Sequence, residues 1–167
     1  GDCGEQLNPL TELDVIFPVL HGSFGEDGTL QGLLEMANIA YVGAGVLGSA
    51  LGMDKAVFKD VMRTCGVPVL NSVTVTRQQI RQGLNDVIAV AEQMSAYPLF
   101  TKPANLGSSV GITRCRGRAD LVEGLQEAAR YDRRILVEQG LDHAREIEVS
   151  VLGNDQPQVS VPGEILP

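Results

Sequence analysis

LFTKPANLGSSVGITRC, residues 99–115, is the stretch that decides the fold. It predicts two consecutive strands, 99–102 and 110–115, joined by a loop of small residues at 104–109. No helical pattern separates the two strands, so we expect them to pair in antiparallel fashion. The elements around them must therefore build on an antiparallel pair.

The segments on either side complete a regular order. Residues 72–75 alternate as a strand, and Thr76-Arg77-Gln78-Gln79 has the form of a capping box that opens a helix. Residues 119–130 are amphipathic, and residues 134–138 form an apolar strand. From residue 69 the order is therefore β-α-β-β-α-β, which predicts a split βαβ sandwich with an antiparallel sheet, of the α+β class.

A parallel pattern precedes this unit. Residues 14–20 are a nearly continuous apolar run, typical of a strand buried on both faces. A glycine-rich loop at 21–28, a helix at 29–38 and a strand at 40–42 follow. This is one βαβ unit, and a parallel sheet needs more neighbours than it supplies. We therefore expect the rest of an α/β sheet to lie outside these residues.

Further elements link and end the chain. A helix is predicted at 52–65, because Gly66 and then Pro68 provide the usual stop signal. Two strands are predicted near the C-terminus, at 146–152 and 158–165.

Composition limits the class of protein. The 167 residues carry a net charge of −8, which argues against a nucleic-acid-binding face. No apolar run approaches the roughly 20 residues of a membrane span. The chain has an odd number of cysteines, which lie far apart at Cys3, Cys65 and Cys115. This pattern disfavours a disulfide framework or a zinc site, and it favours a location in the reducing cytoplasm. Because the chain opens at Gly1 rather than Met, we also expect its true start to be missing.

The loop at 105–111 is the first candidate site. Small residues let a ligand approach the backbone, and the Ser108 and Ser109 hydroxyls add donors for an anion such as phosphate. Lys102 ends the preceding strand, where its ammonium could lie over phosphates. Lys55 begins a helix, where the macrodipole disfavours a cation unless an anion offsets the cost. A plain hairpin loop and two solvated lysines remain the alternative.

Two other segments carry polar groups at strand ends. His21, Glu26 and Asp27 follow the first strand, where open α/β sheets bind ligands. They could hold a charged small molecule, or the acids could cap the next helix while His21 hydrogen-bonds the loop. Glu138 and Glu146 flank a short hinge and would suit an amino group and ribose hydroxyls, although charged strand ends are ordinary.

The motifs gain specificity from their order along the chain. They are HG-x-x-GEDG at 21–28, MDK at 53–55, KP-x-x-x-GSSVG at 102–111, VEQG at 137–140, REIEV at 145–149 and VLGN at 151–154. In this combination the chain resembles the D-alanine–D-alanine ligases of the ATP-grasp superfamily. The resemblance implies the end of a Rossmann-like lobe at 1–50, a small ATP-grasp lobe at 51–143 and the beginning of the C-terminal ATP-grasp lobe at 144–167.

The resemblance also implies roles for the first group of candidates. Lys55 and Lys102 match the two lysines on the ATP phosphates, and Ser109 matches a contact of the phosphate loop. Ser108 resembles the serine of the catalytic hydrogen-bonded network near the first D-alanine. His21 matches the histidine that approaches that D-alanine and its acyl phosphate. If Val110 begins a strand, adjacent Ser108 and Ser109 side chains should point in different directions, as these separate roles require.

The hinge is assigned to the nucleotide in the same way. Glu138 and the backbone of Leu141 match the adenine contacts, and Glu146 matches the ribose-binding acid. Position 139 is Gln where many relatives have Lys, and the match of Glu146 depends on a gap in the stretch 142–144.

The implied activity is ATP-dependent joining of two D-alanines through a D-alanyl phosphate, for peptidoglycan synthesis in the cytoplasm. The resemblance implies Mg²⁺ or Mn²⁺, with the metal ligands outside this chain, and a homodimer that binds neither nucleic acid nor membrane. The alternatives are another ATP-grasp ligase, such as a D-alanine–D-lactate ligase, and a nucleotide-binding module without catalysis.

Overall fold

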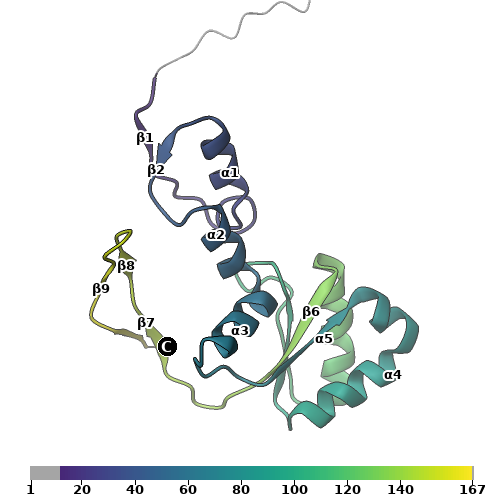
Figure 1. Cartoon of the computed structure of the whole chain (residues 1–167). Coiled ribbons are helices and arrows are strands. Elements are labelled where there is room, and N and C mark those ends of the chain that lie inside the picture. Colours follow the sequence, from purple (N-terminus) through teal and green to yellow (C-terminus); the bar gives the residue numbers. More distant parts are fainter. Residues whose placement is uncertain (1–11, 167) are drawn as a thin grey trace, which may run out of the picture.

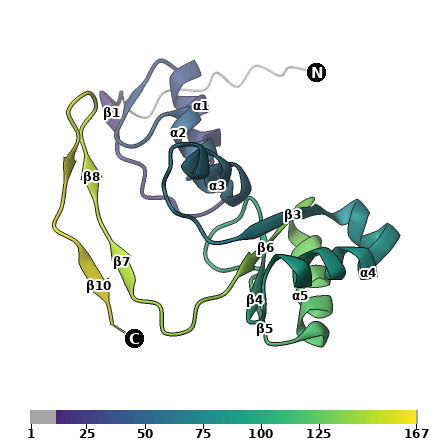
Figure 2. The same ribbon diagram turned by 60° about the horizontal axis from the view of Figure 1, so that its bottom comes forward.

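The computed structural model describes residues 12–166 and is built around a four-stranded antiparallel sheet. The strand order is β3-β6-β4-β5, with β3 at Ser72–Thr76, β6 at Arg134–Gln139, β4 at Leu99–Pro103 and β5 at Thr113–Cys115. Helix α4, Arg77–Met94, and helix α5, Arg118–Tyr131, lie beside this sheet (Figures 1 and 2). The predicted β-α-β-β-α-β order is confirmed.

The alternation of β6 gives the sheet two different faces. Ile135 and Val137 belong to the main core, which α4 and α5 complete together with residues of the other strands. Leu136 points to the other face and packs with Ala56 and Ala104. Side chains two apart share a face of a strand, so Glu138 lies on the same face as Leu136. The buried residues of the main core are Val75, Ile80, Val87, Ile88, Ala91, Leu99, Cys115, Leu121, Leu125, Ala128, Ile135 and Val137.

Local sequence explains how the two helices are placed. The capping box is confirmed, because the Gln79 backbone N–H donates to Thr76 Oγ1 at 3.2 Å and the Thr76 backbone N–H donates to Gln79 Oε1 at 2.7 Å. Helix α5 approaches the sheet closely at Gly124, where an added Cβ would lie 2.4 Å from Thr101 Oγ1. Any larger residue at position 124 would force the helix away from β4.

The N-terminal βαβ unit is present but smaller than predicted. It consists of β1 at Val15–Ile16, α1 at Thr29–Met36 and β2 at Ala40–Tyr41, and the two strands run parallel. The predicted strand at 14–20, buried on both faces, is wrong for this structure. Phe17 and Val19 are both 69% exposed, because β2 is the only strand paired with β1 within residues 12–166.

The helix predicted at 52–65 is confirmed over most of its length, but it begins later than expected. The structure has α2 at Val46–Met53 and α3 at Lys55–Thr64, separated by Asp54 in an extended conformation. Asp54 forms an isolated β-bridge with Asn105, and its carboxylate accepts the Val57 N–H at 3.0 Å, which caps α3. The tertiary bridge thus interrupts a pattern that looks continuous in sequence. The stop at Gly66 is confirmed by its left-handed backbone, with φ of 75°.

The strand predicted to begin at Val110 begins only at Thr113. Ser108 and Ser109 have left-handed backbones, with φ of 52° and 57°, and Gly111 has φ of 70°. A chain in this conformation turns and cannot continue a strand. The premise that strand alternation separates the Ser108 and Ser109 side chains is therefore wrong.

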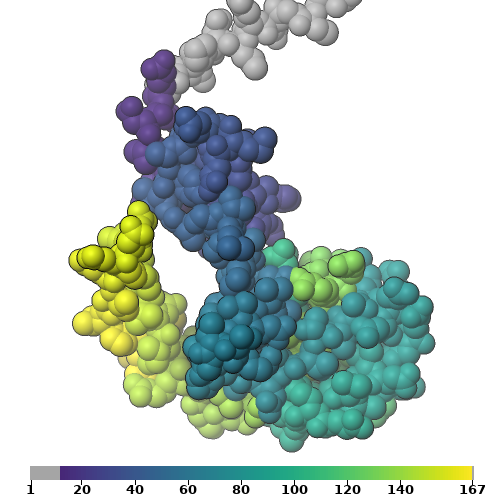
Figure 3. All heavy atoms as spheres, viewed as in Figure 1, coloured from purple at the N-terminus to yellow at the C-terminus, as the bar shows by residue number. Residues whose placement is uncertain are grey.

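The C-terminal segment forms an extended antiparallel ribbon. The predicted strands at 146–152 and 158–165 are each divided in two, giving β7 at Glu146–Glu148, β8 at Val151–Leu152, β9 at Gln158–Val159 and β10 at Gly163–Ile165. Strand β7 pairs with β10, and β8 pairs with β9. This ribbon stands apart from the four-stranded sheet and reaches toward the N-terminal unit (Figure 3).

Two remaining predictions concern cysteines and membrane spans. Cys65 is exposed and Cys115 is buried, and both are free thiols; Cys3 lies outside the described residues. Within residues 12–166 no helix is long and apolar enough to cross a membrane. The domain boundaries after residues 50 and 143 stay predictions.

Candidate functional site

A cavity of about 330 Å³ lies on the sheet face that carries Leu136. Its charged lining comes from α3, β4 and β6, which bring Lys55, Lys59, Lys102 and Glu138 together. The remaining lining residues are mostly apolar and are Gly52, Phe58, Pro68, Val69 and Leu136. The cavity therefore combines an apolar wall with an excess of positive charge.

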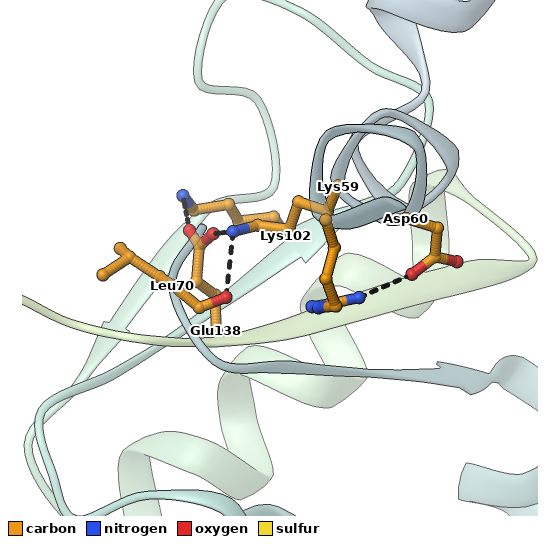
Figure 4. A network of polar contacts seen from close by, with 6 residues as sticks. Lys59, Asp60, Leu70, Lys102 and Glu138 are labelled. Atoms are coloured by element: carbon orange, nitrogen blue, oxygen red, sulfur yellow. Dashed lines mark hydrogen bonds and ion pairs between the residues drawn. The ribbon is translucent and has the colours of Figure 1, made fainter. Parts of the chain in front are cut away.

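Glu138 is the centre of the charged group (Figure 4). It is 6% exposed, and it forms ion pairs with Lys59 through Oε1 and with Lys102 through Oε2. Burial alone would raise the pKa of Glu138, but the hydrogen bonds from Lys102 and Lys59 outweigh it and hold the pKa below its ordinary value. Glu138 is therefore a carboxylate with two cationic partners at neutral pH.

Lys59 is a further charged residue of the site that the sequence patterns did not indicate. Its ammonium contacts Glu138 and also donates to the Leu70 carbonyl at 3.3 Å, and its side chain is 13% exposed. Lys59 follows Lys55 by four residues, which places both on one face of α3. This spacing could have indicated that Lys59 accompanies Lys55, but it does not show which strand this face of α3 packs against.

Lys55 is the first residue of α3, as the sequence predicts for the start of a helix. Its backbone N–H donates to the Ala104 carbonyl at 2.9 Å, and its ammonium donates to the Leu106 carbonyl. Burial lowers the pKa of Lys55, and the positive charge of Lys102 lowers it further. Two lysines close enough to repel each other are an arrangement that a bound anion would stabilise.

Asp54 holds α3, which carries Lys55 and Lys59, against β6. Its carboxylate caps α3 and forms an ion pair with Arg134 of β6. The residue is 8% exposed. The same carboxylate thus joins the beginning of α3, and with it Lys55, to the strand that carries Glu138.

A second cavity, of about 640 Å³, lies between the N-terminal unit and the loop after β4. His21, Gln31 and Lys55 are among its polar lining residues, with Leu106 and Gly107 from the loop. Lys55 lines both cavities. The structure therefore places His21 on a cavity that shares the lining residue Lys55 with the lysine-rich one.

The acids beside His21 hold their own loop. Asp27 accepts the Thr29 N–H at 3.0 Å and the Phe24 N–H at 2.9 Å, which fixes the entry to α1. Glu26 accepts the Gly22 N–H at 2.5 Å. The alternative that both acids cap the next helix holds only in part: Asp27 accepts the first backbone N–H of α1, whose N-cap residue is Gly28, whereas Glu26 closes the loop.

The other predicted residues are not brought into these cavities. Ser108 and Ser109 are exposed in the loop, and Leu141 and Glu146 are exposed beyond β6. None of the four lines either cavity. In the hinge, the Gln139 and Gly140 N–H groups already donate to the Asn71 and Pro98 carbonyls, at 2.9 and 2.8 Å. The roles of these residues, and of His21, Lys55, Lys102 and Glu138, stay predictions.

Comparison with known proteins defines the class. The fold, with an antiparallel sheet covered by two helices, matches solved structures of D-alanine–D-alanine ligases, which are ATP-grasp enzymes. The family model described as D-ala D-ala ligase C-terminus matches residues 61–167, and the one described as D-ala D-ala ligase N-terminus matches residues 2–44. The chain belongs to the D-alanine–D-alanine ligase family.

Individual relatives agree with this assignment. A D-alanine–D-alanine ligase of Natranaerobius thermophilus is 49% identical over 98% of this chain, and one of Heliobacterium modesticaldum is 52% identical over 96%. The D-alanine–D-alanine ligase structure from Coxiella burnetii has a TM-score of 0.83 and 40% identity, over 93% of this chain and 45% of that one. The chain spans 44% of the length of each of the two curated relatives.

Proposed function

We propose that this chain supplies the ATP-phosphate site and part of the first D-alanine site of an ATP-dependent D-alanine–D-alanine ligase. The observation that carries the proposal is the cavity lined by Lys55, Lys59 and Lys102 and by one carboxylate, Glu138, which pairs with Lys59 and Lys102. Three cations against one anion suit a polyphosphate, and the apolar wall suits a base. Relatives named D-alanine–D-alanine ligase at about half identity support the substrate.

In this proposal the residues act by binding and charge neutralisation. Lys55 and Lys102 hold the phosphate oxygens of ATP while the carboxylate of one D-alanine attacks the terminal phosphoryl group, which forms a D-alanyl phosphate and releases ADP. The amine of a second D-alanine then attacks the acyl phosphate, and inorganic phosphate leaves as the amide forms. His21 lies on the adjoining cavity and is assigned to the first D-alanine, together with Ser108, which follows the lining residue Gly107 in the loop after β4.

The remaining assignments concern the nucleotide and its metal. We assign Ser109 to the phosphates, Glu138 and the Leu141 backbone to adenine, and Glu146 to ribose. Such ligases use a divalent ion, Mg²⁺ or Mn²⁺. Residues 12–166 offer no group of three or more His, Cys, Asp or Glu side chains that could hold a metal, so no step is assigned to metal ligands of this chain. A cytoplasmic homodimer is part of the same proposal.

Lys102→Ala tests the phosphate site in the full product of the gene that encodes this chain. Losing one preorganised cation should lower kcat/KM for ATP by about 100- to 1000-fold. The matched control is Arg114→Ala on the neighbouring strand, whose partner Asp142 is exposed and which should leave kcat/KM nearly unchanged. Near-normal kcat/KM for ATP in Lys102→Ala would overturn the proposal.

A second candidate concerns the second substrate. A D-Ala:D-Ser ligase structure from Enterococcus faecalis is 37% identical, with a TM-score of 0.81, over 92% of this chain. Product analysis with D-alanine, D-serine and D-lactate as competing acceptors distinguishes the specificities. We expect D-alanyl-D-alanine as the main product.

A further inference from the structure

Glu138 has two lysine partners, and they are held differently. Lys59 contacts two acceptors, the Glu138 carboxylate and the Leu70 carbonyl (Figure 4). Lys102 has Glu138 as its carboxylate partner and lies 5.6 Å from the centroid of the Phe100 ring. The Lys102 side chain is 23% exposed, against 13% for Lys59. Lys59 is therefore the more firmly anchored of the two.

This difference matters when an anion enters the cavity. A phosphate oxygen that attracts Lys102 must draw its ammonium away from Glu138. A carboxylate that is 6% exposed cannot be left without a cation, because an unpaired buried charge is strongly unfavourable. A second cation on the same carboxylate removes this obstacle. The charged groups that face Glu138 within residues 12–166 are Lys59 from α3 and Lys102 from β4, with Lys55 about one turn earlier on α3.

We propose that Lys59 is a positioning residue that stays on Glu138 and balances its charge, so that Lys102 is free to bind the nucleotide phosphates. The inference rests on the proposed function and deepens it. Lys59 also holds the Glu138 carboxylate in one orientation, because Oε1 is fixed by a side chain that is itself tied to Leu70. Lys59 itself touches no reacting atom in this arrangement.

The kinetic test compares Lys59→Met with Lys59→Arg in the full gene product. Without Lys59, Lys102 should remain on Glu138, so the KM for ATP should rise by about 10- to 100-fold, the range for one charge-assisted hydrogen bond. The kcat should change by less than about 3-fold, because Lys59 makes no contact specific to the transition state. Lys59→Arg should restore most of the affinity for ATP.

Arg63→Met is the matched control on the same helix. Arg63 pairs with exposed Asp60, so the substitution removes one positive charge from α3 without touching Glu138. It should leave the KM for ATP within about 2-fold of the unaltered enzyme, as expected for an exposed ion pair. An equal KM in Lys59→Met and Arg63→Met would overturn the inference, as would failure of Lys59→Arg to restore affinity.

A titration gives a readout that does not depend on catalysis. Carboxyl-detected NMR without nucleotide should show a higher pKa for Glu138 in Lys59→Met than in the unaltered protein, and no change in Arg63→Met. The comparison applies to the folded variant, because unfolding alone would also raise this pKa toward its ordinary value. An unchanged pKa in folded Lys59→Met would overturn the inference. Failure of the unaltered enzyme to use ATP would overturn the proposed function, whereas normal ligation with an unchanged KM in Lys59→Met would overturn only the role of Lys59.

Discussion

Strands β6 and β7 follow each other along the chain but differ in burial. Four consecutive residues of β6 are buried, from Ile135 to Glu138, whereas all three residues of β7 are exposed. Strand β7 is richer in charge, but the contrast holds for the same residue type: Ile135 of β6 is 0% exposed and Ile147 of β7 is 52% exposed, so composition alone does not explain it. The cause is the second layer: α4 and α5 cover one face of β6, and α3 lies toward the other.

The N-terminal unit resembles the ribbon of β7–β10, because both regions expose apolar side chains. Its exposed apolar side chains include Phe17 and Val19, and those of the ribbon include Val151 and Leu152. An apolar strand contributes stability only where another layer removes its side chains from water. The sheet of β3–β6 therefore has its own core, and the two flanking regions have little of one within residues 12–166.

The largest expected difference lies in backbone hydrogen exchange. Amides of β6 should open only with the whole sheet, whereas those of β8 lie in a two-stranded ribbon that opens at little cost. We expect protection in the 167-residue chain to differ by about a thousandfold or more, as follows from a core stability of several kcal/mol. Similar protection in β6 and β8, measured by NMR, would contradict the conclusion that the sheet has a core of its own and the ribbon does not.

Truncation of a leucine in each region is the next test. Leu125 of α5 is fully buried, so Leu125→Ala should lower the free energy of unfolding by about 2–5 kcal/mol. Leu152 of β8 is 74% exposed, and Leu152→Ala should change it by less than about 0.5 kcal/mol. Urea unfolding followed by far-UV circular dichroism measures both variants, and equal losses would contradict the assignment of the core.

Asp54 tests the connection between the regions. Asp54→Ala removes the cap of α3 and the partner of Arg134, so it should cost about 2 kcal/mol. Asp60→Ala on the same helix is the control, because its ion pair with Arg63 is exposed and should contribute less than about 0.5 kcal/mol. If thermal unfolding shows no difference between these variants, Asp54 does not join α3 to the sheet.

The smallest expected effect is a pH dependence of stability that comes from Glu138. Its pKa in the folded chain lies below the ordinary value of 4.5, because the two lysine hydrogen bonds outweigh burial. The stability it contributes is therefore fully present above pH 4.5 and is lost as the pH falls through the lower pKa of the folded state. Urea unfolding of the unaltered chain and of Glu138→Gln should show a steeper loss in acid for the unaltered chain, and parallel curves would contradict it.

Sequence patterns predicted much of the sheet and its helices because their signals are local. The capping box at Thr76 and Gln79 is complete within four residues, and the stop at Gly66 depends on backbone freedom at one position. Lys55 was placed at the start of a helix for the same reason. Such signals are satisfied by neighbours along the chain and need no knowledge of the packing.

Three features required the tertiary structure. The helix break at Asp54 depends on a bridge to Asn105 and an ion pair with Arg134, which lie far along the chain. The exposure of the strand near Phe17 depends on which layers cover it. The left-handed turn at Ser108 and Ser109 depends on how the loop returns to the sheet, and neither residue type demands that conformation.

The sequence by itself determined the family, the order of elements in the central sheet and the presence of Lys55, Lys102 and Glu138 as candidate residues. Only the tertiary structure decided that Lys59 joins Glu138 and that one carboxylate is shared by two lysines. The physical reason is that an ion pair is set by where side chains meet in space. Helix periodicity places Lys59 on a face of α3, but only the packing of α3 against β6 brings that face to Glu138.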